Sequence, residues 1–154
     1  MEAEELLEAL DALLDGERDR TACMANAAAL LYHKLDRVNW AGFYLFKRGE
    51  LVLGPFQGRV ACTRIAPGRG VCGAAFAGKR ALRVDDVHAF PGHIACDAES
   101  RSEIVLPLMD AQGEPFGVLD IDSPVPARFT AADERLLSEA AARIAAALRL
   151  GEDA

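Results

Sequence analysis

Three of the four cysteines in this chain lie between residues 62 and 96, in or beside segments rich in glycine and proline. They are Cys62, Cys72 and Cys96. Cysteines in loops can be exposed and reactive, whereas cysteines inside helices or strands usually fill space in the core. The fourth, Cys23, falls within a predicted helix and has that structural interpretation. The loop cysteines therefore indicate either thiol redox chemistry or a metal site.

The surroundings of each loop cysteine give a first indication of its reactivity. Cys72 lies close to the start of a predicted short helix over residues 70–78, and a helix N-terminus stabilises a thiolate. Cys96 lies between His93 and Asp97, so that an imidazolium would favour its thiolate and a carboxylate would oppose it. These arguments from the residues alone favour Cys72 as the reactive thiol.

A zinc site is the alternative that the cysteines raise. Ligand types that zinc accepts are offered by Cys62, Cys72, Cys96, His88 and His93. The paired C-x-x-C spacing of structural zinc sites is absent. The sequence therefore favours redox chemistry over a resident metal, and we expect no cofactor.

Carboxylates form the second group of candidate residues. Asp120 and Asp122 share one face of a predicted strand over residues 116–122, and Glu103 opens the neighbouring strand. If these side chains are buried, desolvation and mutual repulsion would keep at least one protonated, which would make it a general acid near neutral pH. A solvated sheet face is the alternative for the two aspartates, and Glu103 by itself favours that alternative.

Two aromatic residues, Trp40 and Tyr44, lie on one face of a predicted strand over residues 38–47, on either side of Gly42. Rings that flank a glycine could form a small box for a methyl group or a cation. The same alternation is also typical of aromatic side chains in a core, and that is the interpretation that the sequence alone favours.

The elements that must position these residues follow from hydrophobic periodicity and turn signals. The expected helices cover about residues 6–14, 22–34, 70–78 and from Thr130 onward, and the expected hairpins pair 38–47 with 51–57 and 102–109 with 116–122. A short strand over 81–84 and a long loop over 85–101 complete the pattern. Thr130 and Asp133 resemble a capping box.

This order of elements predicts an α+β fold with a central antiparallel sheet. We expect the terminal helices to pack on one sheet face. We expect the segment from Cys62 to Arg101 to cover the other face and to form the lid of a pocket.

Composition bounds the class of protein. The chain has 154 residues, of which 51% are hydrophobic, and we expect residues 1–154 to form a single domain. No apolar run is long enough to span a membrane, and the acidic N-terminus is unlike a signal peptide. The sequence therefore predicts a cytoplasmic protein with reduced thiols. The net charge of −7 disfavours binding to nucleic acid and to anionic membranes.

Six segments between Asn39 and Pro124 form a recognisable series: NWAGFY (39–44), GPFQG (54–58), GRGVCG (68–73), GHIACD (92–97), SEIVLPL (102–108) and GVLDIDSP (117–124). In this order they resemble the free methionine-(R)-sulfoxide reductases, which are enzymes built on a GAF domain. The resemblance implies a single GAF domain with a lidded pocket. It also implies reduction of the R-sulfoxide of free methionine, not of methionine within proteins.

The resemblance also assigns roles to the cysteines. It implies that Cys96, not Cys72, is the nucleophile, that Cys62 resolves the intermediate and that Cys72 is a second thiol that can help. Attack by Cys96 would leave a cysteine sulfenic acid, which would condense to an intramolecular disulfide. A thioredoxin-type dithiol would then reduce that disulfide.

The resemblance makes Glu103, Asp120 and Asp122 the pocket carboxylates, and Trp40 and Tyr44 the aromatic part of the pocket. One neutral carboxyl would protonate the leaving oxygen, and ionised ones would bind the substrate's ammonium group. A homodimer formed through the terminal helices is compatible with the sequence. The alternative functions are a non-catalytic GAF module that binds a small ligand and a thiol redox sensor without turnover.

Overall fold

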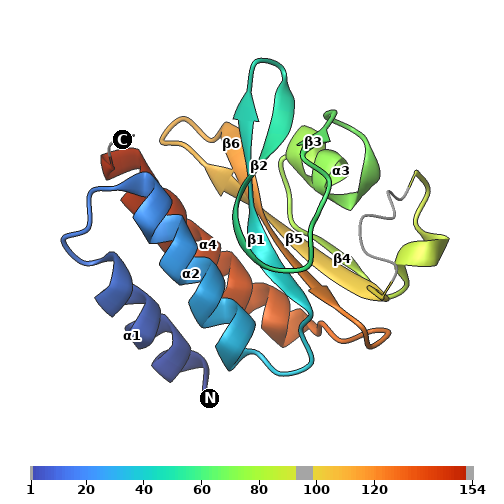
Figure 1. Cartoon of the computed structure of the whole chain (residues 1–154), viewed down its shortest axis with the longest axis horizontal. Coiled ribbons are helices and arrows are strands. Elements are labelled where there is room, and N and C mark those ends of the chain that lie inside the picture. Colours follow the sequence, from blue (N-terminus) through green and yellow to red (C-terminus); the bar gives the residue numbers. More distant parts are fainter. Residues whose placement is uncertain (1, 93–98, 152–154) are drawn as a thin grey trace.

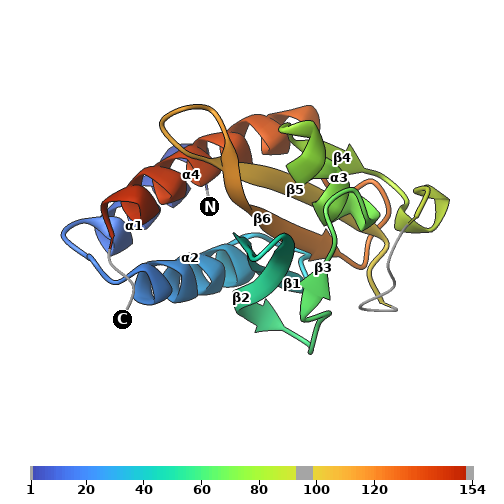
Figure 2. The same cartoon turned by 90° about the horizontal axis from the view of Figure 1, so that it is seen from above.

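A six-stranded sheet flanked by helices makes up the part of the chain that the structure, a computed structural model, describes: residues 2–92 and 99–151. Two long helices cover one face of the sheet, a third helix packs on those two, and a short helix lies on the other face (Figures 1 and 2). The elements are α1 (Ala3–Leu14), α2 (Arg20–Lys34), β1 (Trp40–Lys47), β2 (Glu50–Gly58), β3 (Arg64–Ile65), α3 (Gly70–Gly78), β4 (Leu82–Val84), the 3-10 helix η1 (Val87–Ala89), β5 (Ser102–Met109), β6 (Pro115–Ser123) and α4 (Ala131–Leu150).

The predicted α+β class with its central antiparallel sheet is confirmed. Both hairpins form, and the strand order is β3-β2-β1-β6-β5-β4 with every pairing antiparallel. The sequence did not predict β3, a two-residue strand that pairs with Leu51 and Val52 of β2. It also missed η1, which lies inside the expected loop. Both elements are too short to show a hydrophobic period.

The two hairpins meet at β1 and β6, which are neighbours in the middle of the sheet. Trp40 lies opposite Asp122, and Gly42 lies opposite Asp120. On the other side of β6, Glu103 lies opposite Asp122. Because directly opposite residues point to the same face of a sheet, this register gathers the predicted acids and aromatics on one face.

The helix face of the sheet holds the larger hydrophobic core. Ala41 and Phe43 of β1 point into it, as the alternation of that strand predicts. Leu10 of α1 and Ile144 of α4 pack there with no exposed surface. Burial of one such Leu or Ile side chain contributes about 1.5–3 kcal/mol. Of the helices that the structure describes, none combines the length and the apolar character needed to cross a bilayer.

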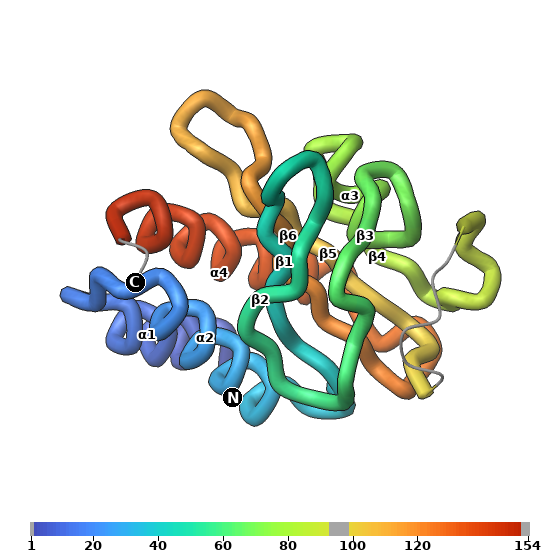
Figure 3. Tube along the Cα trace, turned by 45° about the horizontal axis from the view of Figure 1, so that its top comes forward, coloured from blue at the N-terminus to red at the C-terminus, as the bar shows by residue number. Residues whose placement is uncertain are grey.

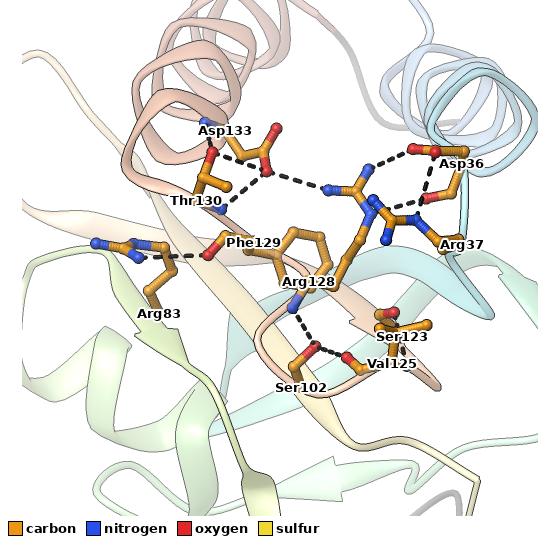
Figure 4. A network of polar contacts seen from close by, with 10 residues as sticks. All are labelled: Asp36, Arg37, Arg83, Ser102, Ser123, Val125, Arg128, Phe129, Thr130 and Asp133. Carbon is orange, nitrogen blue, oxygen red and sulfur yellow. Dashed lines mark hydrogen bonds and ion pairs between the residues drawn. The ribbon is translucent and has the colours of Figure 1, made fainter.

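A polar network closes the end of this core next to the start of α4 (Figure 4). Thr130 and Asp133 form the predicted capping box, in which each side chain accepts the other residue's backbone N–H. The Arg128 guanidinium donates to Asp133 Oδ2 at 3.1 Å and to Asp36 Oδ1 at 2.9 Å. Ser102 Oγ accepts from the backbone N–H of Arg128 at 3.3 Å. We call these five residues the Arg128 network; it joins the end of α2, the start of β5 and the start of α4.

The segment between β2 and β4 lies on the opposite face of the sheet, where α3 packs against β5 and β6 (Figure 3). Gly73 allows α3 to approach the preceding turn, because a Cβ at this position would lie 2.6 Å from the carbonyl oxygen of Ala66. The backbone N–H of Gly68 donates to the carbonyl of Gly73 at 2.9 Å. This packing sets Cys72, in the first turn of α3, over the sheet.

Candidate active site

A cavity of about 50 Å³ lies between α3 and the sheet face that carries the acids. It is lined by Trp40, Tyr44, Val60, Ala61, Ile65, Arg69, Gly70, Val71, Cys72, Ser100, Glu103, Asp120 and Asp122. Six of the eight predicted site residues are therefore brought together: the two aromatics, the three acids and Cys72. Cys62 lies in the segment that follows β2, and Cys96 lies outside the described residues.

The acids lie on β5 and β6, the two strands of the second hairpin. Glu103 of β5 and Asp120 of β6 are buried, with 8% and 6% of their surface exposed, and Asp122 is half-buried. The alternative of a solvated sheet face is therefore wrong, because α3 covers these side chains. Asp120 Oδ1 is buried and has no hydrogen-bond partner among the described residues.

Burial and mutual repulsion both change the acidity of this group. Desolvation raises the pKa of Glu103 well above its ordinary value, and the neighbouring charge of Asp120 raises it further. Desolvation also raises the pKa of Asp120, followed by the charge of Asp122. Neither Glu103 nor Asp120 forms an ion pair with a basic side chain in the part of the chain that the structure describes. The site can therefore hold a neutral carboxyl at neutral pH.

Cys72 faces these acids across the cavity. Its thiol is 4% exposed, and Sγ donates to Oε2 of Glu103 at 3.9 Å. Burial raises the pKa of the thiol, and the charges of Asp120 and Glu103 raise it further. The expectation that the start of α3 would stabilise a Cys72 thiolate is therefore wrong. The dipole of a short helix is outweighed by desolvation and two facing carboxylates.

The aromatic wall of the cavity is a stack of three rings. The Trp40 ring lies 5.2 Å from that of Phe56 and 6.1 Å from that of Tyr44, measured between centroids. Gly42 makes room for this stack, because a Cβ there would lie 2.3 Å from Cβ of Phe56 and 2.8 Å from Cη2 of Trp40. Trp40 and Tyr44 are thus core aromatics that also line the cavity, so the two interpretations of these residues are compatible.

The polar atoms of the same two rings hold the segment that carries Cys62. Trp40 Nε1 donates to the carbonyl of Arg59 at 3.0 Å, and the Tyr44 hydroxyl donates to the carbonyl of Cys62 at 2.9 Å. Desolvation, followed by the charge of Asp120, raises the pKa of Tyr44 far above its ordinary value, so the phenol stays a donor. Sequence reasoning did not foresee this positioning role, which depends on tertiary contacts.

The remaining cysteines differ in their surroundings. Cys23 is buried in the core on the helix face, as predicted, and its thiol is free. Cys62 is half-buried and takes part in a disulfide. Among residues 2–92 and 99–151, the side chains close enough to hold a metal ion together are Cys72, Glu103 and Asp120. The described members of the predicted cysteine–histidine set, Cys62, Cys72 and His88, do not form such a group.

Several residues of the cavity were missed from the sequence. Ser100 is buried beside the acids and accepts a hydrogen bond from Nδ2 of Asn39 at 3.3 Å. Arg69 and Val60 lie at the exposed rim. The position of Arg69 between two turn glycines was a usable signal, whereas Ser100 and Val60 belong to no recognisable pattern.

Comparison with known proteins agrees with this geometry. The model of the GAF domain family matches residues 3–148. The free methionine-R-sulfoxide reductase of Escherichia coli K12 is 55% identical over 134 residues, which cover 87% of this chain and 81% of that protein. The enzyme of the same name from Saccharomyces cerevisiae is 45% identical over 126 residues, covering 77% and 70%.

A solved structure shows the same arrangement of elements. The free methionine-R-sulfoxide reductase of Neisseria meningitidis, in complex with its substrate, superposes with a TM-score of 0.92 at 44% identity. The match covers 96% of this chain and 89% of that one.

Proposed function

Because the chain belongs to the free methionine-R-sulfoxide reductases, a family of GAF-domain enzymes, we propose that its cavity reduces the R-sulfoxide of free methionine by thiol chemistry. One observation carries the proposal: two buried carboxyls with raised pKa values lie beside an aromatic wall in a small cavity. This combination supplies a proton donor and a surface for an S-methyl group in one place.

The acid has a specific task in this reaction. A sulfoxide oxygen is a poor leaving group until it is protonated, so the S–O bond breaks only if an acid donates to that oxygen. Glu103 and Asp120 are the best candidates, since burial raises the pKa of both side chains and so favours their protonated forms. We assign the binding of the substrate's ammonium group to Asp122, which is half-buried and lines the cavity.

The nucleophile in this proposal is Cys96. Its thiolate attacks the sulfoxide sulfur, the S–O bond breaks, and methionine leaves with its sulfur reduced by two electrons. The oxygen passes to Cys96 as a sulfenic acid. The raised pKa of the Cys72 thiol supports this choice, because a thiol that is protonated at neutral pH is a weak nucleophile.

Resolution of the sulfenic acid completes the turnover. The Cys62 thiol attacks the sulfur of Cys96, an S–S bond forms and water leaves. The disulfide at Cys62 is the kind of bond that this step requires, and we propose Cys96 as its partner. A thioredoxin-type dithiol then reduces the bond and becomes oxidised itself. Cys72 is available as a second resolving thiol.

The proposal includes a selection for the free amino acid. The cavity is small, about 50 Å³, and its walls come from both sides of the sheet–helix gap. Enclosure of the substrate between α3 and the sheet would exclude a continuing peptide backbone. We place the enzyme in the cytoplasm, where a dithiol reductant is supplied, as a single domain over residues 1–154.

A coupled assay tests the reaction. The protein is mixed with thioredoxin, thioredoxin reductase and NADPH, and receives free methionine R-sulfoxide, the S epimer or a blocked peptide sulfoxide. We expect NADPH oxidation with the free R epimer alone. Absence of turnover with all three would overturn the proposal and leave a non-catalytic ligand-binding or redox-sensing module.

Cysteine variants test the roles. Cys96→Ser should abolish turnover, Cys62→Ser should allow one turnover and then stall, and Cys23→Ser is the control that should leave the rate unchanged. If Cys72→Ser abolishes turnover and Cys96→Ser does not, the assignment of the nucleophile is wrong.

A further inference from the structure

Three potential metal ligands converge in the cavity from three different elements. One ligand atom each of Cys72 in α3, Glu103 in β5 and Asp120 in β6 lies within 4.8 Å of the other two. All three side chains are buried. Cys72 Sγ and Glu103 Oε2 are 3.9 Å apart.

This cluster lacks a positive charge of its own. Neither carboxyl is paired with a basic side chain within the described residues. Asp120 Oδ1 is buried without a hydrogen-bond partner among the described residues, and such an atom is costly to bury. Asp122 and the exposed Arg69 are the other charged groups that line the cavity. The orphaned oxygen therefore leaves an acceptor position for a ligand in the cavity.

We propose that Cys72, Glu103 and Asp120 bind one thiophilic divalent cation of the zinc type. In a tetrahedral zinc site with bonds of about 2.3 Å to sulfur and 2.1 Å to oxygen, two ligand atoms are about 3.6 Å apart. The 3.9 Å between Sγ and Oε2 is close to this value, so small side-chain movements are sufficient. Three protein ligands leave the fourth position of the ion open.

The chemistry of the ligands determines which ions bind. The thiol of Cys72 loses its proton as the S–metal bond forms, and protonated carboxyls release theirs, so binding releases protons and tightens as the pH rises. A thiolate ligand selects zinc or cadmium over magnesium or calcium. Binding itself is independent of the proposed function. Its consequence rests on that function: a metal on the carboxyls removes the proton donor and excludes the substrate.

Cadmium titration of the full-length chain tests binding without any assay of activity. The protein is first oxidised so that Cys62 is in its disulfide, and a count of two free thiols identifies Cys23 and Cys72 as the remaining ones. Formation of a Cd–thiolate bond gives a charge-transfer band in the ultraviolet. We expect the band to saturate at one equivalent of Cd²⁺, to be lost on addition of excess Zn²⁺, and to be unaffected by Mg²⁺.

Matched variants locate the site. The band should be absent in Cys72→Ser and unchanged in Cys23→Ser, which removes the other free buried thiol. Asp120→Asn should keep the band and raise the dissociation constant at least tenfold. Thermal unfolding checks that Cys72→Ser is folded. If it is not folded, the dissociation constant of Asp120→Asn for Cd²⁺ decides whether the site exists.

Three results would overturn the proposal: no band in the wild-type protein, a band that survives in Cys72→Ser, or an unchanged affinity in Asp120→Asn. A protein that binds cadmium as expected but does not reduce the free R-sulfoxide would overturn the proposed function and not this site. Failure of the two proposals is therefore distinguishable.

Discussion

Two clusters of polar groups lie on opposite faces of the sheet at the start of β5. Ser102 points to the helix face and belongs to the Arg128 network, whereas the next residue, Glu103, points into the cavity. In the network, a guanidinium that is 8% exposed meets two carboxylates and a backbone carbonyl. In the cavity, buried carboxyls and a thiol meet one another, and Glu103 and Asp120 have no basic partner in the part of the chain that the structure describes.

The two clusters differ in charge balance, and the Asp36 carboxylate of the network is exposed whereas Glu103 and Asp120 are buried. The network satisfies its polar groups, so the free energy of desolvation is offset by charge-assisted hydrogen bonds. The cavity leaves one oxygen unsatisfied and keeps carboxyls and a thiol protonated. Buried polar groups without partners and with shifted pKa values are typical of functional sites. The network should therefore support stability, and the cavity should support chemistry at some expense of stability.

Glu103→Gln should separate the effect on catalysis from the effect on stability most strongly. Loss of a general acid lowers kcat/KM by about 10²- to 10⁴-fold, whereas an amide in place of a buried acid should not lower the free energy of unfolding. The coupled assay and urea unfolding measure these quantities, with Glu114→Gln at the exposed hairpin tip as the control. A Glu103→Gln variant that is fully active but less stable would show that Glu103 supports stability and not catalysis.

Arg128→Met should have the opposite pattern. Removal of the buried guanidinium leaves Asp133 and the backbone carbonyl of Asp36 without their donor, whereas the Asp36 carboxylate is 75% exposed, so we expect a cost of about 1–2 kcal/mol in urea unfolding. The kcat/KM of the folded variant should stay within about twofold of the wild type. Arg83→Met removes a more exposed ion pair to Glu134 and should cost less than about 1 kcal/mol. Equal costs for both arginines would contradict the role of burial.

The pH dependence of stability should identify Asp120 as a group with a raised pKa. The folded state holds this proton more tightly than the unfolded chain, so the contribution of Asp120 to stability is fully present below its ordinary pKa of 3.8 and is lost as the pH rises through the raised pKa. Each unit of elevation corresponds to about 1.4 kcal/mol. Asp120→Asn should therefore become more stable relative to the wild type as the pH increases, as measured by urea unfolding between pH 5 and 8. A constant difference would show that Asp120 is ionised in the folded protein.

Thr130→Ala should give the smallest effect, and only on stability. Loss of the side-chain acceptor for the Asp133 N–H removes half of the capping box and should cost about 1 kcal/mol. Thr21→Ala, at an exposed position inside the first turn of α2, should change stability by less than about 0.5 kcal/mol. A drop in kcat/KM in Thr130→Ala would couple the network to the cavity across the sheet.

Periodicity was sufficient to predict most of the fold. Helices α1 and α4 and both hairpins have clear hydrophobic periods, and alternation placed Trp40 and Tyr44 opposite to Ala41 and Phe43 correctly. The shared face of Asp120 and Asp122 followed from the same rule. Motif resemblance, not periodicity, connected these residues to one pocket.

Charge environment could not be read from the sequence. The position of Cys72 near a helix start suggested a reactive thiolate, but its surroundings depend on strands that are distant in the chain. Arg128 is similar. A lone arginine in a loop is expected to be exposed, yet this side chain is buried and pairs with Asp36 and Asp133. Contacts of this kind exist only after the sheet has closed.

The pairing of Trp40 with Asp122 also affects the order in which a newly made chain can fold. The hairpin of β1 and β2, with the aromatic wall, leaves the ribosome long before β6 is made. Until β6 is made, β1 has an open edge and the cavity lacks Asp120. Pairing of β6 with β1 then closes a long loop, which is entropically costly. An incomplete chain could thus carry thiols but not the acids that surround them. Assembly of the pocket is therefore tied to completion of the central strand pair, and this step should limit the rate of folding.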